Sequence, residues 1–248
     1  MKHFIFILGT LFSAACFADA YNILDEKRDR PIPVTTYLPV NAAECSDAHP
    51  CPVALLSSGY GVAHNEYSFI AHQLNQSGYL VIAIQHELPG DPPLAVTGNL
   101  FENRSENWQR GAVTLAVVRN ALKDQHPGYD FDHLTLIGHS NGGDISAWLA
   151  NDDKPYISRL ITLDHRRVPL PRTKDIDLLS IRGSDFPADA GVLPTDKEVQ
   201  QFGGCIVTIP QSRHNDMTDN GPDWLKTAIA GVIDDHLSGK GCRQPAGA

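Results

Sequence analysis

The sequence has little positive charge for its size. Its 20 lysines and arginines stand against 29 aspartates and glutamates, which gives a formal net charge of -9 at pH 7. This excess of negative charge disfavours binding to nucleic acid or to an anionic membrane surface. The sequence also has no internal repeat, and no stretch after residue 20 is long and apolar enough to span a bilayer. We therefore expect no nucleic-acid partner and no integral membrane segment in the mature chain.

Cysteine is scarce, with five residues in the chain. There is no C-x-x-C pair, which argues against a zinc site, and nothing in the sequence implies another metal or a cofactor. Four cysteines follow the first 20 residues, and an even number in an exported chain suggests two disulfides. Of the three pairings, we favour Cys45–Cys51 across a short loop and Cys205–Cys242 between a late strand and the tail. Four free thiols in a reducing compartment are the alternative.

The first 20 residues have the pattern of a secretory signal peptide. A short polar start is followed by a mostly apolar stretch that ends at Cys16, and then by Ala18-Asp19-Ala20, a cleavage pattern of small residues. This pattern predicts cleavage after Ala20, a single mature domain over residues 21–248, and a secreted or periplasmic location. An uncleaved anchor is the alternative.

Apolar, strand-like runs alternate with helical patterns along the rest of the chain. The strand-like runs cover 34–38, 53–57, 79–85, 134–137, 159–164, 178–182 and 205–209, and the helical patterns cover 67–76, 106–126, 144–150, 195–202 and 222–237. This alternation predicts an α/β fold with a mostly parallel central sheet and helices on both faces. The loops after the carboxyl ends of the strands are where such sheets form their sites.

Ser140 stands in the segment G-H-S-N-G-G, between a predicted strand and a predicted helix. A G-x-S-x-G segment in that context forms a strained turn that lifts the serine hydroxyl above the edge of the sheet. The glycines leave room for the tight turn. The next N–H, of Asn141, then lies at a helix N-terminus, where developing negative charge is stabilised. We therefore predict that Ser140 is a catalytic nucleophile.

A serine nucleophile needs a base to accept its proton and an acid to orient that base. His214 follows the last predicted strand and is the candidate base. Asp185 follows the strand at 178–182 through a glycine and a serine, and it is the favoured acid. Asp189, in the same loop, and Asp164, at the end of the preceding strand, are the alternative acids. The chain order of serine, acid and histidine is that of the α/β-hydrolases.

Two backbone N–H groups are needed to bind the oxyanion that forms during acyl transfer. One candidate is the N–H of Asn141, and the other is the N–H of Tyr60 in the glycine-rich segment that follows the strand at 53–57. His86 and Glu87 end the strand at 79–85 on the same edge of the sheet. They are candidates to line the pocket, with a structural role in the loop as an equal alternative.

Three further segments carry a family resemblance: S-G-Y-G at 58–61, E-Y-S-F at 66–69 and G-Y-L-V at 78–81. With the serine segment, they make nearly all of the mature sequence resemble the serine α/β-hydrolases. The branch that they resemble contains platelet-activating-factor acetylhydrolases, dienelactone-hydrolase-like proteins and bacterial polyester-cleaving cutinases. That resemblance implies an esterase or lipase with an accessible site. The chain departs from it at Ser58, where histidine is usual, and at Ser140, where dienelactone hydrolases proper use cysteine.

The short link at 166–174 leaves no room for a large cap domain. We therefore predict an exported serine hydrolase that cleaves carboxylic esters through an acyl-enzyme on Ser140. Its substrate would be a small-molecule ester or a lipid or polymer ester. The alternatives are an acyltransferase or a peptidase with the same triad and, less favoured, a non-catalytic binding protein on the same fold. The sequence does not indicate an oligomeric state.

Overall fold

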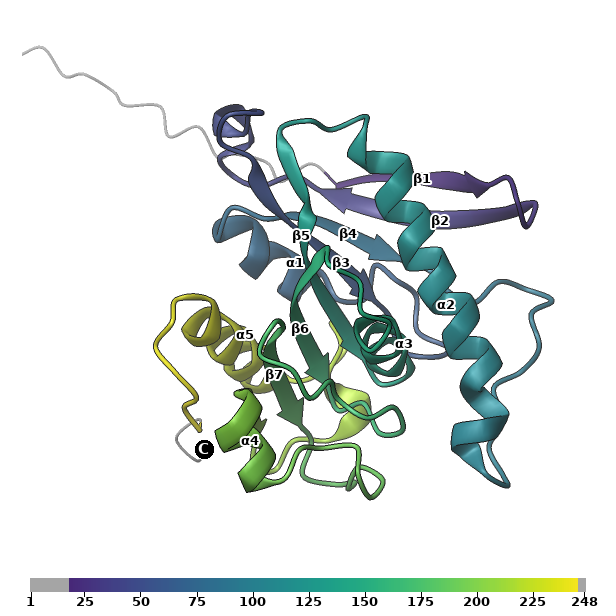
Figure 1. Ribbon diagram of the computed structural model, residues 1–248, viewed down its shortest axis with the longest axis vertical. Coiled ribbons are helices and arrows are strands. Elements are labelled where there is room, and N and C mark those ends of the chain that lie inside the picture. The colour runs from purple at the N-terminus through teal and green to yellow at the C-terminus, as the bar shows by residue number, and fades with distance from the viewer. Residues whose placement is uncertain (1–17, 245–248) are drawn as a thin grey trace, which may run out of the picture.

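The computed structural model describes residues 18–244, which fold around an eight-stranded mixed sheet (Figure 1). The strands are β1 (Ala18–Asp25), β2 (Arg30–Tyr37), β3 (Cys51–Ser57), β4 (Leu80–Ile84), β5 (Tyr129–His139), β6 (Ile157–Leu163), β7 (Asp177–Arg182) and β8 (Cys205–Thr208). Their order across the sheet is β1-β2-β4-β3-β5-β6-β7-β8. Strand β2 runs antiparallel to β1 and β4, and all other neighbours are parallel.

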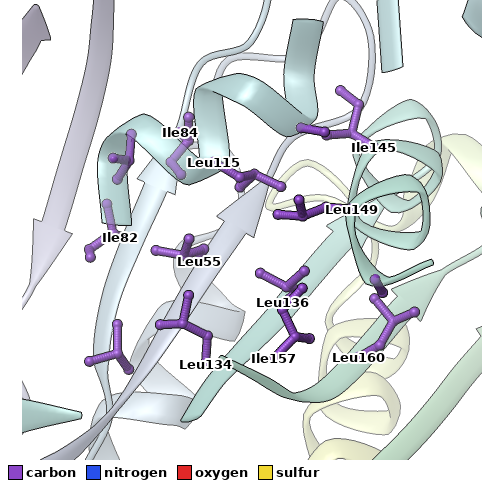
Figure 2. Close-up of a cluster of buried hydrophobic side chains, with 14 of the residues drawn as sticks. Leu55, Ile82, Ile84, Leu115, Leu134, Leu136, Ile145, Leu149, Ile157 and Leu160 are labelled. Carbon is purple, nitrogen blue, oxygen red and sulfur yellow. The ribbon is translucent and has the colours of Figure 1, made fainter. Parts of the chain in front are cut away.

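Helices cover both faces of this sheet. They are α1 (Ser68–Gln76), α2 (Leu100–Lys123), α3 (Asn141–Ala150), α4 (Asp196–Phe202) and α5 (Asp223–Leu237), with short 3-10 turns at Ala42–Glu44 and His214–Asp216. Leu115 of α2 and Ile145 of α3 belong to the core cluster on one face (Figure 2). Ile70 of α1 and Ile229 of α5 belong to the cluster on the other face.

Strand β3 illustrates why the sequences of the central strands are continuously apolar. Val53 and Leu55 pack into the cluster under α2 and α3, whereas Ala54 and Leu56 pack into the cluster under α1 and α5. Successive side chains point to opposite faces of a sheet, so a strand that is covered on both faces needs apolar residues at every position. All five residues of β4 are buried for the same reason.

The predicted α/β architecture is confirmed, and each predicted strand and helix is present. Strand β1 was not predicted; its first three residues, Ala18–Ala20, which pair with Thr35–Tyr37, were assigned to the signal peptide, and the rest of β1 was given no element. Helix α2 begins six residues before the predicted start, since the side chain of Asn99 caps it by accepting the N–H of Glu102. Residues 1–17, which carry most of the predicted signal peptide, lie outside the described residues.

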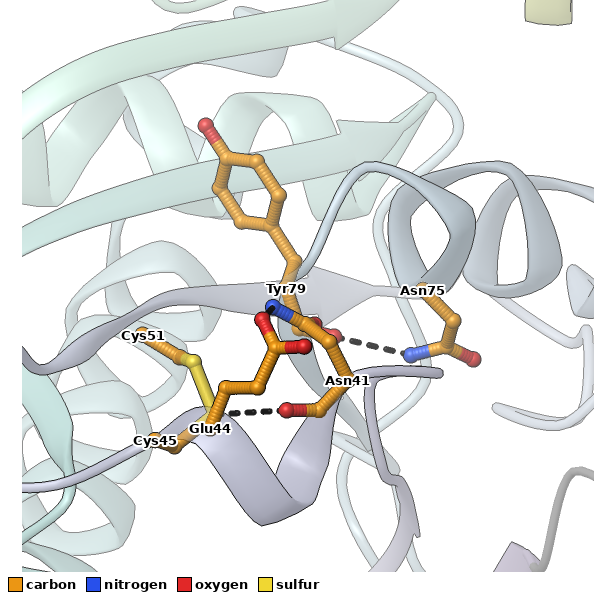
Figure 3. The surroundings of a disulfide bond; sticks show 6 residues. All are labelled: Asn41, Glu44, Cys45, Cys51, Asn75 and Tyr79. Carbon is orange, nitrogen blue, oxygen red and sulfur yellow. Dashed lines mark hydrogen bonds between the residues drawn. A yellow bond between two sulfur atoms is a disulfide. The ribbon is translucent and has the colours of Figure 1, made fainter.

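The two predicted disulfide pairings are confirmed. Cys45–Cys51 joins the first 3-10 turn to the start of β3, close to Asn75, which donates to the carbonyl oxygen of Tyr79 (Figure 3). Cys205–Cys242 joins β8 to the segment after α5.

The connection between β6 and β7 contains no helix, and no cap domain is evident between residues 18 and 244. Over the same residues, no helix combines the length and apolar character that a membrane span requires.

Candidate active site

Ser140 occupies the sharp turn between β5 and α3. Its backbone has φ 53° and ψ −121°, a strained conformation for a residue with a side chain. The turn depends on glycine on either side. A Cβ on Gly138 would lie 2.2 Å from the carbonyl oxygen of Gly142, and a Cβ on Gly142 would lie 2.3 Å from the carbonyl oxygen of Ser57. The glycines therefore let the helix start directly over the sheet and hold Ser140 at its edge.

Ser140, His214 and Asp164 form a continuous hydrogen-bonded chain. Nε2 of His214 lies 2.9 Å from Oγ of Ser140, and Nδ1 lies 2.5 Å from Oδ2 of Asp164. A carboxylate only accepts, so Nδ1 carries the hydrogen. In the neutral imidazole, Nε2 is then the acceptor for the serine hydroxyl. This is the arrangement in which a histidine can remove the proton of a serine nucleophile.

Asp164 is fully buried and its carboxylate is saturated with donors. The N–H of Gly183 donates to Oδ1 over 2.9 Å, and Arg182 pairs with the same oxygen at 3.0 Å. Arg166 donates to Oδ2 over 3.2 Å. Burial alone would raise the pKa of Asp164, but the hydrogen bond with His214 and the charge of Arg182 outweigh burial and lower the pKa to about 2. The carboxylate is therefore ionised at neutral pH.

The sequence analysis favoured Asp185 as the acid, and the geometry corrects this choice. Asp185 is exposed and reaches His214 only at the backbone, where its Oδ1 accepts the N–H of His214 over 2.9 Å. Asp189 is paired with Arg167 instead. Asp164 follows β6, which lies directly beside β5 and the serine turn, and the ring of His214 reaches over this part of the sheet to contact both Ser140 and Asp164. Asp185 follows β7, one strand further from the serine turn.

Of the two candidate oxyanion donors, Asn141 directly follows the serine and Tyr60 lines the same pocket. Asn141 is the first residue of α3, so its N–H has no acceptor within the helix. Its side chain is fixed from behind, because its Oδ1 accepts Nε1–H of Trp108 over 2.9 Å and its Nδ2 donates to Asn107 over 2.8 Å. Tyr60 lies in the loop after β3, and its phenol accepts the N–H of Leu94 over 3.1 Å.

His86 and Glu87 support the site from behind and are not among the residues that line the pocket around Ser140. Nε2 of His86 lies 2.9 Å from Oγ of Ser57, and burial lowers the pKa of His86 to about 3. Glu87 accepts from the amide of Asn141 over 3.3 Å. Burial raises the pKa of Glu87. His86 therefore fixes the side chain of Ser57 at the end of β3, and Glu87 fixes the side chain of Asn141 next to the serine.

Ser140 opens into a pocket of about 430 Å³. Residues of the loop after β3 and of the loop that carries His214 line this pocket. Glu66, which sequence analysis had only noted within a motif, also lines the pocket, and its Oε2 accepts the amide of Asn220 over 2.9 Å. The residues that line the pocket are Gly59, Tyr60, Gly61, Val62, Ala63, Glu66, His139, Ser140, His214, Asn215, Thr218 and Asn220.

A scan against protein-family models and a search of curated proteins found no match to this sequence. The fold, in contrast, is similar to that of many solved structures. A dienelactone hydrolase from Anabaena variabilis superposes with a TM-score of 0.61 at 15% identity, over 90% of this chain and 98% of that chain. An S-formylglutathione hydrolase from Agrobacterium tumefaciens gives a TM-score of 0.61 at 16% identity, over 93% and 97%.

A third similar structure is Thermogutta terrifontis esterase 2, phosphoramylated by tabun. Its TM-score is 0.64 at 12% identity, over 92% of this chain and 97% of that chain. These likenesses extend over nearly the whole described chain and agree with the mostly parallel sheet covered by helices. The chain therefore adopts the α/β-hydrolase fold.

Proposed function

We propose that this protein is an exported serine hydrolase that cleaves carboxylic esters through an acyl-enzyme on Ser140. The observation that carries the proposal is the hydrogen-bonded chain from Ser140 through His214 to Asp164 at the edge of an open pocket. The esterase and hydrolase names of the similar structures support the same reaction class. Two disulfides are compatible with a secreted or periplasmic location.

The reaction follows from the positions of these groups. Oγ of Ser140 attacks the ester carbonyl carbon while Nε2 of His214 takes the hydroxyl proton, and Asp164 stabilises the resulting imidazolium. The N–H groups of Tyr60 and Asn141 bind the oxyanion. The carbon–oxygen bond to the alcohol then breaks, and His214 protonates the leaving alcohol. Water repeats the sequence, releasing the carboxylic acid and restoring Ser140.

The pocket favours short acyl groups over long ones. Its walls carry the carboxylate of Glu66 and the amides of Asn215 and Asn220, which a long alkyl chain would have to desolvate without compensation. We expect p-nitrophenyl acetate and butyrate to be better substrates than the palmitate.

The test is a series of p-nitrophenyl esters from acetate to palmitate, with wild type, Ser140→Ala and the control Ser77→Ala. Ser77 is an exposed serine after α1, and its hydroxyl donates only to the carbonyl of Gln73. We expect wild type and Ser77→Ala to turn over and Ser140→Ala to be inactive. A fluorophosphonate should label wild type at Ser140. Turnover that survives in folded Ser140→Ala would refute the proposed nucleophile.

The same assay separates esterase from acyltransferase and peptidase. An esterase yields acid and alcohol, whereas an acyltransferase yields a transfer product when a low concentration of a second alcohol is present. Labelling at Ser140 without turnover of any ester would point to a peptidase or a transferase with a more selective pocket.

A further inference from the structure

Tyr67 and His139 form a buried hydrogen-bonded link behind the candidate triad. The phenol oxygen of Tyr67 lies 2.8 Å from Nδ1 of His139, and Nε2 of His139 lies 3.0 Å from the carbonyl oxygen of His214. The N–H of Gly59 donates to the same phenol oxygen over 3.0 Å. Tyr67 is 1% exposed and His139 is 3% exposed, so water cannot replace these contacts. The link therefore runs from the loop after β3 to the backbone of the candidate base.

The chemistry of the end groups assigns every proton in this link. The carbonyl oxygen of His214 only accepts, so Nε2 of His139 carries a hydrogen. Burial lowers the pKa of His139 to about 3, so the ring is neutral and Nδ1 is an acceptor. Tyr67 must then donate its hydroxyl hydrogen to Nδ1 while its oxygen accepts the N–H of Gly59. Each group therefore has one arrangement of donor and acceptor that satisfies all three hydrogen bonds.

The two ends of the link are the parts that must face each other across the reacting carbonyl. Gly59 precedes Tyr60, the candidate oxyanion donor, and His214 is the candidate base. Gly59 packs tightly against both members of the link: a Cβ on Gly59 would lie 3.0 Å from Nδ1 of His139 and 3.2 Å from the hydroxyl of Tyr67.

Tyr67 is itself anchored to the loop that follows His214. It is the residue before α1, and the next two N–H groups, of Ser68 and Phe69, donate to the carboxylate of Asp219 over 2.8 and 3.1 Å. The N–H of Asp219 donates to the carbonyl oxygen of Glu66 over 2.9 Å. Loss of the phenol would therefore free Gly59 and His139 while the polypeptide around residue 67 stays in place.

We propose that Tyr67 and His139 are positioning residues that set the distance between the oxyanion-binding loop at Gly59–Tyr60 and the base His214. This inference rests on the proposed function for its reaction. A donor that is fixed in position before reaction stabilises a developing oxyanion more than one that must reorganise. The link should therefore act on the transition state and leave binding of the ground-state ester nearly unchanged.

The test compares Tyr67→Phe with the matched control Tyr79→Phe. Tyr79 is also a buried tyrosine, and its hydroxyl accepts from Arg159 over 2.7 Å, but it precedes β4 at the edge of the sheet opposite Ser140. The first readouts are kcat per active site and KM for p-nitrophenyl acetate, with the active sites counted by titration with a fluorophosphonate. The second readout is the rate at which the fluorophosphonate labels Ser140. For Tyr67→Phe we expect kcat and the labelling rate to fall about 10- to 100-fold, with KM within about twofold of wild type. For Tyr79→Phe we expect the kcat per titrated site, the KM and the labelling rate to match those of wild type.

Two substitutions of His139 test the two hydrogen bonds of its ring separately. His139→Asn keeps an acceptor near the position of Nδ1 and loses the donor to His214, whereas His139→Gln keeps a donor near Nε2 and loses the partner of Tyr67. Each should lower kcat. Tyr67→Phe should have a smaller effect in the His139→Gln background than in wild type, because the Tyr67–His139 bond is already absent there. If Tyr67→Phe does not fold, the two single variants of His139 test the link in its place.

The proposal is overturned if Tyr67→Phe retains kcat within twofold per titrated site, or if Tyr79→Phe loses kcat to the same extent. The failure of the proposed function has a different signature. Wild type that is labelled at Ser140 but hydrolyses no ester would refute the esterase function, and the ratio of labelling rates would still decide the role of the link. Wild type that is neither labelled nor active would refute both.

Discussion

The carboxylate of Asp164 lies 2.5 Å from Nδ1 of His214, although Asp164 follows β6, His214 follows β8 and β7 lies between these two strands. This contact is buried on the side of the aspartate and faces the pocket on the side of the histidine. Asp164 also has a positive φ, 47°, as does Ser140. Two of the three candidate catalytic residues therefore hold strained backbone conformations, which is typical of residues that the surrounding fold forces into a functional position.

Substitution of the two competing acids should give very different losses. We expect Asp164→Asn to lower kcat about a thousand- to ten-thousandfold, because the amide no longer holds the histidine in the required tautomer. Asp185→Asn should lower kcat less than about fivefold, since an amide oxygen can still accept the backbone N–H of His214. Turnover of p-nitrophenyl acetate checks both variants, with circular dichroism as the control for folding. The reverse ranking would restore Asp185 as the acid.

The contribution of Asp164 to stability should depend on pH. Its pKa in the folded protein is about 2, below the ordinary value of 3.8, so the folded state favours the ionised carboxylate. That contribution is fully present above about pH 4 and is lost as the pH falls towards 2. Urea unfolding of wild type and Asp164→Asn at pH 6, 4 and 3 measures it. The difference in free energy of unfolding should shrink over this range, and a difference that is independent of pH would contradict the prediction.

Glu66 should select against negatively charged acyl groups. Among the described residues that line the pocket, it is the only aspartate, glutamate, lysine or arginine. A like charge about 6 Å away across a partly solvated pocket costs on the order of 1 kcal/mol, which corresponds to about fivefold in rate. Glu66→Gln should therefore raise kcat/KM for p-nitrophenyl hemisuccinate about fivefold relative to p-nitrophenyl butyrate.

A matched control for this selectivity is Glu102→Gln, which removes an exposed carboxylate from the first turn of α2. It should leave the ratio of the two rates unchanged. Added salt should also reduce the difference in the hemisuccinate-to-butyrate ratio of kcat/KM between wild type and Glu66→Gln, because the carboxylates of Glu66 and of the substrate are partly exposed to solvent. A hemisuccinate-to-butyrate ratio that is the same in all three proteins would remove Glu66 as a selectivity residue.

The two disulfides should contribute unequally to stability. Cys205–Cys242 closes a sequence separation of 37 residues, whereas Cys45–Cys51 closes 6. If the bonds act by restricting the unfolded chain, their loss costs about 4 and about 2 kcal/mol, respectively. Paired Cys→Ser variants, unfolded in urea under the same conditions, compare the two losses. Equal losses, or a larger loss for the short loop, would show that native contacts rather than loop closure dominate.

The sequence by itself determined the features that depend on neighbouring residues. Gly138 and Gly142 predicted the serine turn because a tight turn excludes Cβ atoms wherever it occurs. Apolar runs such as that of β3 predicted buried parallel strands, since both faces of such a strand must be covered. The order of the elements along the chain and the local pairing of Cys45 with Cys51 followed from the same short-range reasoning.

Only the tertiary structure decided the contacts that depend on which strands are neighbours. Asp164 and Asp185 both follow strands and both contact His214, but Asp164 contacts Nδ1 of the ring, whereas Asp185 accepts the backbone N–H. The link from Tyr67 to His139 joins residues 72 positions apart, and no local pattern marks it. Such contacts are set by the order of strands across the sheet and by the depth of burial, which the packing of the whole chain determines.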